Sequence, residues 1–200
     1  MKILNNKHLI LASSSPRRQE LIRSLNLPYT ICVSDVDETL TEILTPVEVV
    51  KVLSTKKATA VFEKKQSKNK HGIIIGADTI VVKDGRIFGK PKDKSDAISM
   101  LLQLQGTAHE VYSGIACIDS DSGKIIVESQ KTIVNMKPLK IEQIERYVNT
   151  GEPMDKAGSY AIQGLGATMV DSIEGSYFNV VGLSLSLLSE MLGEFGIEVI

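Results

Sequence analysis

The apolar run at residues 73–82 constrains the fold of this 200-residue chain more than any other stretch. Its sequence, IIIGADTIVV, is apolar at odd and even positions alike. A strand buried on both faces has this pattern, so the run predicts a central strand of a sheet. Asp78 interrupts the run. Because a buried carboxylate is costly unless it is paired, bound to a metal or poised as a base, Asp78 is the first candidate for chemistry.

A second pattern, near the start of the chain, predicts a strand, a tight serine turn and the beginning of a helix. The apolar residues 9–11 precede three serines, and Pro16 suits the first helical turn with Ser15 as its N-cap. The N–H groups and the dipole at such a helix start favour an anion. Arg17 and Arg18 lie where the dipole disfavours cations, which favours a phosphate ligand there. Solvated surface arginines are the alternative, which this stretch leaves open.

Composition indicates an ordinary globular protein. A hydrophobic content of 42% allows one domain over residues 1–200 or two closely joined lobes. Its 23 basic and 24 acidic residues argue against nucleic-acid or membrane binding. No apolar run approaches the roughly 20 residues of a membrane span, and Cys32 and Cys117 are expected to be core thiols in a reducing compartment. We therefore expect a cytoplasmic location.

Charged residues in two further stretches are candidates for a site. Asp37 and Glu38 follow a strand-like segment, where they form either a metal-binding or catalytic loop or an exposed acidic turn. Lys57 lies close to the middle of the apolar face of a helix that begins at Pro46. An inward lysine needs a partner, so it either reaches an anion in a polar cavity or extends to the edge of the face. Lys90 follows a predicted hairpin.

The remaining chain predicts a mixture of helices and strands. Glycines return at residues 152–166 beside an Asp155-Lys156 pair and Gln163, whose amide can donate to and accept from a nucleobase edge. The histidines lack a shared spacing and are expected to be structural or exposed. Helices are predicted at 95–105, 141–148 and 183–192, strands at 28–33, 111–118 and 125–134, and a strand, turn and strand over 167–181.

Short motifs in a fixed order over almost the whole chain resemble the Maf family, also called septum formation inhibitor proteins. That family comprises nucleoside triphosphate pyrophosphatases. The motifs are Ser13-Ser14-Ser15-Pro16-Arg17-Arg18, Asp37-Glu38, Lys57, Gly76-Ala77-Asp78-Thr79, Gly89-Lys90-Pro91, Asp155-Lys156-Ala157-Gly158 and Ile162-Gln163-Gly164.

The resemblance implies hydrolysis of a nucleoside triphosphate between its α and β phosphorus atoms, with Mg²⁺ or Mn²⁺, to a nucleoside monophosphate and pyrophosphate. It implies an elongated mixed-sheet α/β fold with two lobes and a central cleft, similar to inosine triphosphate pyrophosphatases, and a homodimer. Removal of non-standard nucleotides and control of cell division are the candidate roles. A nucleotide-binding regulator of septum formation with incidental hydrolysis is the alternative.

The resemblance also implies a role for each motif residue. Arg18 after Pro16-Arg17, Thr79 after Asp78 and Gln163 before Gly164 resemble the members that act on dTTP and UTP, with CTP and modified pyrimidine nucleotides as further candidates. The 7-methyl-GTP branch has Trp-Arg, Gln and Ser-Glu-Gly at these places. We expect Glu38 and Asp78 to hold the metal and Asp78 to accept the proton of the attacking water. The expected substrate-binding residues are Ser13, Ser15, Arg17, Arg18, Lys57, Thr79, Lys90, Asp155, Lys156 and Gln163.

Overall fold

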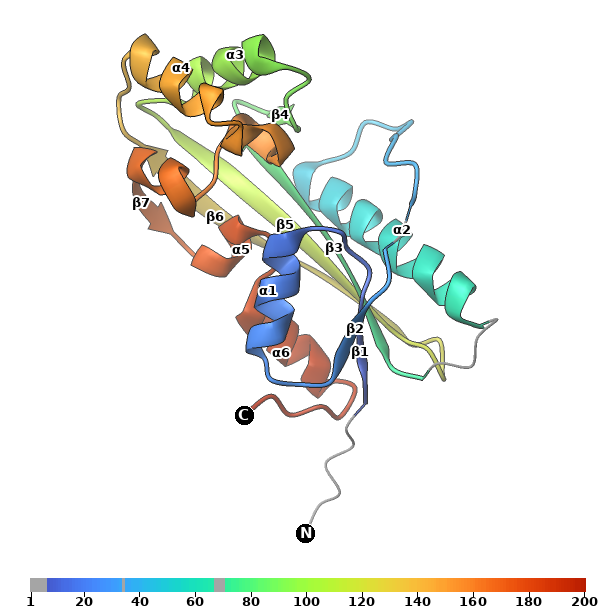
Figure 1. Ribbon diagram of the computed structural model, residues 1–200. Helices are drawn as coiled ribbons and strands as arrows, with labels where there is room; N and C mark the ends of the chain where they lie inside the picture. Colours follow the sequence, from blue (N-terminus) through green and yellow to red (C-terminus); the bar gives the residue numbers. More distant parts are fainter. Residues whose placement is uncertain (1–6, 34, 67–70) are drawn as a thin grey trace. The chain divides into compact units, whose positions relative to one another are not determined.

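The computed structural model describes residues 7–33, 35–66 and 71–200. Its sheet has seven strands in the order β2-β1-β3-β5-β6-β7, with β4 paired to β3 (Figure 1). The strands are β1 (Leu9–Leu11), β2 (Tyr29–Ile31), β3 (Ile73–Lys83), β4 (Arg86–Phe88), β5 (Ala108–Asp119), β6 (Ile125–Met136) and β7 (Val170–Glu174). The helices are α1 (Pro16–Ser24), α2 (Pro46–Gln66), α3 (Lys94–Leu104), α4 (Ile141–Asn149), α5 (Tyr177–Val181) and α6 (Leu185–Gly193).

The sheet is mixed, and the apolar run lies inside it as predicted. β1 pairs in parallel with β2 and β3, whereas β3 with β4 and β6 with β7 are antiparallel. β3 lies between β1 and β5, and its first six residues are all buried. The predicted mixed α/β class is confirmed. None of the helices in the described ranges is long and apolar enough to cross a bilayer.

The chain divides into two compact units. The first contains the residues up to Asp78 together with Ser113–Gln130 and Gly182–Ile200, and the second contains Thr79–Tyr112 and Lys131–Val181. In the first unit α2 covers one face of the strands, and α1 and α6 lie on the other side (Figure 1). Ala58 and Val61 of α2 pack there on Ile10, Ile74, Ala116 and Ile118.

Two glycines allow α2 to lie very close to the strands. A Cβ at Gly76 of β3 would lie 2.2 Å from the carbonyl oxygen of Ser54, and one at Gly114 of β5 would lie 2.3 Å from that of Val50. Neither glycine has a positive φ. Glycine is therefore present in these strand interiors because a helix backbone takes the place of a side chain.

We expect Gly76→Ala to lower the free energy of unfolding by about 3 kcal/mol, because the new methyl group meets helix backbone that cannot rotate away. The measurement is urea unfolding. Gly193→Ala is the matched control, since a Cβ at this helical position meets nothing within 4 Å. The control should gain up to about 1 kcal/mol from the better helix former. Equal stability of the two variants would contradict the proposed contact.

The second unit has its own core, formed between its strands and α3 and α4. Its members include Val81, Phe88, Leu101, Leu104, Val111, Val134, Ile144 and Val148. Three short 3₁₀ helices follow α4: η1 (Glu152–Asp155), η2 (Ala157–Ser159) and η3 (Gly164–Met169). Asp155 ends η1, Lys156 lies between η1 and η2, and Gln163 directly precedes η3.

One predicted strand in this unit is a helix. The segment after the turn at Gly175 was expected to be extended, but it forms α5. The buried Asn179 explains the difference, because its amide donates to the carbonyl oxygen of Val111 at 3.1 Å and to the hydroxyl of Thr132 at 3.0 Å. These long-range hydrogen bonds override the strand preference of Tyr177 and Phe178.

His109 is a structural histidine, as expected, and it lies within the core of the second unit. It is 3% exposed, and its Nε2 atom lies 2.7 Å from the hydroxyl oxygen of Tyr160. Burial, with a smaller contribution from the charge of Lys83, lowers the pKa of His109 from 6.5 to about 4. Between these two pH values the unfolded chain binds a proton that the folded protein excludes, so stability falls as the pH falls.

His109→Phe should remove this part of the pH dependence. Between about pH 7 and about pH 4.5, the wild type should lose about 2 kcal/mol more unfolding free energy than the variant, since each unit of pKa difference corresponds to about 1.4 kcal/mol. Urea unfolding at both pH values measures the two losses. Equal losses would show that His109 is protonated as readily in the folded protein as in the unfolded chain.

Candidate functional site

In the first unit, three of the predicted charged residues meet, because two carboxylates pair with the ammonium of one lysine. The Nζ atom of Lys57, on α2, lies 2.6 Å from Oδ1 of Asp78 on β3 and 2.8 Å from Oε1 of Glu38. The side chains of Lys57 and Asp78 are 12% and 9% exposed, whereas that of Glu38 is 55% exposed. The inward lysine therefore has two carboxylate partners, and the buried Asp78 is paired.

The acidic segment around Glu38 is held by its neighbours. Oδ1 of Asp37 accepts a hydrogen bond from the backbone N–H of Thr39 at 2.9 Å. Lys56 donates to the carbonyl oxygens of Asp37 and Thr39 at 3.4 and 3.0 Å. Lys56 and Lys57 thus bind the same loop, one through its backbone and the other through Glu38. Sequence patterns did not indicate this role of Lys56, because nothing in a helix-face argument links it to a loop.

The start of α1 lies where the sequence predicted it. Ser15 is the N-cap, with an extended backbone, but its side chain makes no capping hydrogen bond. Its backbone N–H instead donates to the hydroxyl of Ser13 at 3.2 Å. Nη1 of Arg18 lies 3.5 Å from the same hydroxyl, and Nε of Arg18 donates to the carbonyl oxygen of Gly182 at 2.8 Å. Ser13 is therefore the hydroxyl that organises this turn.

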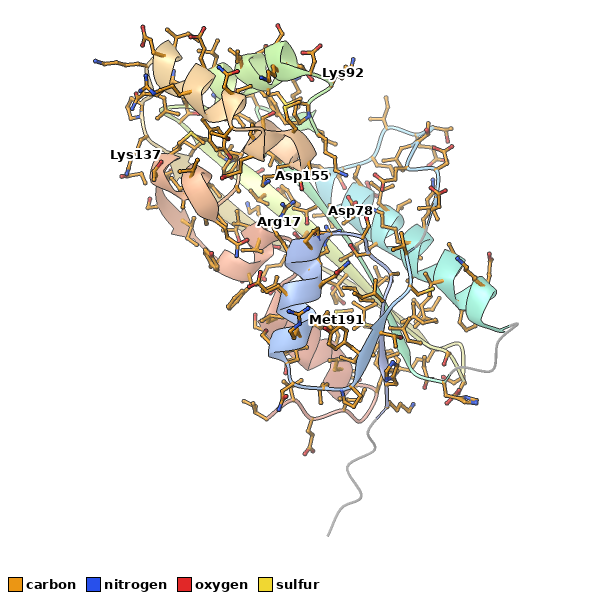
Figure 2. All side chains as sticks on the ribbon, viewed as in Figure 1. Arg17, Asp78, Lys92, Lys137, Asp155 and Met191 are labelled. Atoms are coloured by element: carbon orange, nitrogen blue, oxygen red, sulfur yellow. The ribbon has the colours of Figure 1, made fainter. Side chains whose placement is uncertain are left out.

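The charged side chains at the start of α1 interact with the carboxylates that pair with Lys57. Figure 2 labels Arg17 at the start of α1 and Asp78 on β3. Burial lowers the pKa of Arg18, as Arg17 also does, while the charges of Asp78 and Glu38 act in the opposite direction. Arg18 and Lys57 thus both interact with the carboxylates of Asp78 and Glu38, and Arg17 adds a third positive charge beside Arg18. A net positive charge beside a helix start suits an anionic ligand.

The two carboxylates are suited to a metal ion that arrives with its ligand. Among the residues that the structure describes, no group of three or more His, Cys, Asp and Glu side chains is placed to hold a metal ion. Mg²⁺ is commonly held by one or two carboxylates together with substrate phosphates and waters. Asp78 and Glu38, which meet at Lys57, fit that arrangement and would supply the protein's share of the ligands.

The remaining candidates lie in the second unit, beginning with Thr79, which follows Asp78 directly. The backbone N–H of Gly158 donates to the carbonyl oxygen of Gly89 at 3.1 Å. This hydrogen bond brings the chain just after Asp155-Lys156 next to the residue that precedes Lys90. Nζ of Lys156 lies 2.7 Å from Oδ1 of Asp155 and also donates to the carbonyl oxygen of Glu152. Lys156 is therefore held in place from two sides.

Gln163 is half-buried and precedes η3 directly. Nearby is Glu152, a residue that sequence patterns did not indicate. Its carboxylate accepts hydrogen bonds from the backbone N–H groups of Leu165 and Gly166. The only sign in the sequence is the close spacing of Gly164 and Gly166, which shows that something approaches the backbone without showing what does.

We expect Lys57→Met to lower the free energy of unfolding by about 3 kcal/mol, because it leaves the buried carboxylate of Asp78 without its cation. Lys51→Met on the same helix is the matched control. Lys51 pairs with Glu128 at 3.3 Å, but the two side chains are 36% and 51% exposed, so its loss should change stability by no more than about 0.5 kcal/mol. Urea unfolding of both variants at neutral pH measures the difference, and comparable losses would contradict the buried pairing.

Comparisons with known proteins show which sequences resemble this chain over its length. Residues 8–195 match the family described as Maf-like protein. A protein of Desulforamulus reducens named dTTP/UTP pyrophosphatase is 50% identical over 192 residues, which cover 96% of this chain and 98% of that protein. One of the same name from Pelotomaculum thermopropionicum is 49% identical over 194 residues, covering 97% of this chain and all of that protein.

A solved structure shares the fold. The Ham1 protein of Staphylococcus aureus superposes with a TM-score of 0.54 and covers 94% of this chain and 100% of its own. Its sequence is only 14% identical. The likeness confirms the α/β fold that the motifs implied.

Proposed function

The chain belongs to the family of Maf-like proteins, and from this premise we propose that it hydrolyses dTTP and UTP to the nucleoside monophosphate and pyrophosphate. The observation that carries the proposal is the convergence of Asp78 and Glu38 on Lys57 in a unit whose first helix begins with two arginines. Carboxylates beside a cationic, phosphate-binding helix start are what hydrolysis of a phosphoanhydride requires.

The reaction breaks the bond between the α phosphorus and the oxygen that bridges it to the β phosphorus. Arg17, Arg18 and the N–H groups at the start of α1 bind the negatively charged phosphate chain. Asp78 accepts a proton from the water that attacks the α phosphorus, and pyrophosphate leaves with the bridging oxygen. Lys57 holds the carboxylate of Asp78 in place before substrate arrives, because its ammonium lies 2.6 Å from Oδ1.

Asp78 and Glu38 would hold Mg²⁺ or Mn²⁺ through their oxygen atoms. Such an ion, when bound, neutralises charge on the phosphates and aligns them. For Thr79, Lys90, Asp155, Lys156 and Gln163 we propose substrate binding. Gln163 has the donor and acceptor pair that a pyrimidine edge requires, and with Arg18 and Thr79 it would set the base preference. CTP and modified pyrimidine nucleotides are further candidate substrates.

The assembly and the cellular role stay predictions. A homodimer and a role in removing non-standard nucleotides or in cell division are expectations from the family resemblance, and a cytoplasmic location is an expectation from the composition. A nucleotide-binding regulator is the second candidate function. Incubation with dTTP, UTP, CTP and 7-methyl-GTP in the presence of Mg²⁺, followed by pyrophosphate detection, separates the two. Tight nucleotide binding without turnover would favour the regulator.

Asp78→Asn should reduce kcat for dTTP by at least about 100-fold, because the amide cannot accept the proton of the attacking water. Asp84→Asn is the matched control. Asp84 lies in the exposed turn between β3 and β4 with a φ of 50°, a conformation that asparagine also tolerates. Pyrophosphate release measures turnover, and circular dichroism shows whether each variant is folded. Full activity of folded Asp78→Asn would refute the assignment of the base.

A further inference from the structure

We propose that Glu152 is a positioning residue, which fixes the segment at residues 161–166 so that Gln163 can recognise the nucleobase. This inference rests on the proposed function, because it concerns how the same enzyme distinguishes its substrates. It assigns to Glu152 no contact with substrate. All the contacts involved lie within the second unit.

The carboxylate of Glu152 holds both sides of Gln163. On the C-terminal side, Oε2 accepts from the backbone N–H of Leu165 at 3.1 Å and Oε1 accepts from that of Gly166 at 2.9 Å. On the N-terminal side the link runs through Tyr147, whose hydroxyl donates to Oε1 at 3.0 Å and accepts from the backbone N–H of Ala161 at 3.3 Å. One carboxylate thus fixes the backbone before and after Gln163.

Two glycines show how closely these groups approach the segment. A Cβ at Gly164 would lie 2.8 Å from Oε2 of Glu152, and the backbone there has a φ of 62°. A Cβ at Gly166 would lie 2.8 Å from the hydroxyl oxygen of Tyr147 and 2.4 Å from the carbonyl oxygen of Ala161. The carboxylate and the phenol therefore occupy the space that side chains at these positions would need.

Glu152 must be ionised to accept all three hydrogen bonds. Burial raises its pKa, but the N–H groups of Gly166 and Leu165 and the hydroxyl of Tyr147 outweigh burial and hold the pKa below its usual value. An ionised carboxylate is purely an acceptor, so it can take these donors without leaving one opposed by another donor. A glutamine at this position could not accept all three hydrogen bonds, because its amide nitrogen is a donor.

Positioning matters here because Gln163 receives no other support. In the part of the chain that the structure describes, no protein group is hydrogen-bonded to its side-chain amide. The direction of that amide depends on the backbone, which Glu152 holds. The backbone carbonyl of Glu152 also accepts from Nζ of Lys156. A single residue therefore supports two of the groups proposed to bind substrate.

The experiment measures kcat and KM for dTTP and for dATP in the wild type and in Glu152→Gln. The amide NH₂ of glutamine would face a backbone N–H, so that hydrogen bond is lost and the segment at residues 161–166 is held less firmly. We expect the preference for dTTP, as the ratio of the two kcat/KM values, to fall about tenfold, the effect of losing one well-placed hydrogen bond. The fall should come chiefly from a higher KM for dTTP. Glu145→Gln, an exposed position on α4, is the matched control and should keep the wild-type ratio.

A purely structural role would give a different result. Partial unfolding reduces the fraction of active enzyme, so it lowers kcat for both nucleotides equally and leaves KM and the ratio unchanged. Should Glu152→Gln fail to fold, Tyr147→Phe removes only the hydroxyl that links Glu152 to Ala161. It should lower the ratio about threefold, because Glu152 still holds the backbone of Leu165 and Gly166 and only the link to Ala161 is lost. An unchanged ratio in whichever variant folds overturns the inference.

A double-mutant cycle tests whether Glu152 acts through Gln163. In a Gln163→Ala background, Glu152→Gln should leave the ratio unchanged, because the group that recognises the base is already absent. A further fall in the ratio would overturn the inference. So would a wild type that turns over dTTP and dATP equally well. A wild type that hydrolyses no nucleotide at all would instead refute the proposed function, and the inference with it.

Discussion

The ion pair between Lys57 and Asp78 is the interaction on which the rest of the first unit depends. Asp78 lies inside a strand that is otherwise apolar, and its carboxylate would be costly there without a cation at 2.6 Å. The ammonium reaches it because α2 lies against β3 and β5 with only glycine between the two backbones. The close packing of helix and strand and the pairing of the buried carboxylate therefore depend on each other, because the ammonium reaches Asp78 only while α2 lies close to β3.

Much of the fold could be predicted from local patterns. The central strand followed from apolar residues on both faces, and the start of α1 from Pro16, because such signals act within a few residues. Where long-range hydrogen bonds decide, local patterns failed. Tyr177 and Phe178 suggested a strand, but the contacts of Asn179 with Val111 and Thr132 select a helix. The strand order likewise could not be derived from any single segment.

The site was predictable to a similar extent and for a similar reason. Asp78 and Lys57 were identified because each is a charged residue at a position that periodicity places inside. The partner of Lys57 could not be named, since an anion and a carboxylate satisfy the same requirement; the structure places Asp78 and Glu38 there. Ser15 is the N-cap of α1, as its residue type and place suggested, but its hydroxyl makes no capping hydrogen bond, and its backbone N–H donates to the hydroxyl of Ser13. Local sequence identified the capping residue without identifying the hydrogen bonds around it.

The arrangement around Glu152 has a consequence for how relatives of this protein can diverge. Its carboxylate accepts hydrogen bonds from the main-chain N–H groups at positions 165 and 166. Because these hydrogen bonds go to the main chain, they do not depend on which side chain stands at position 163. If Gln163 recognises the base, as we propose, a substitution there would change the nucleotide preference while the loop keeps its shape.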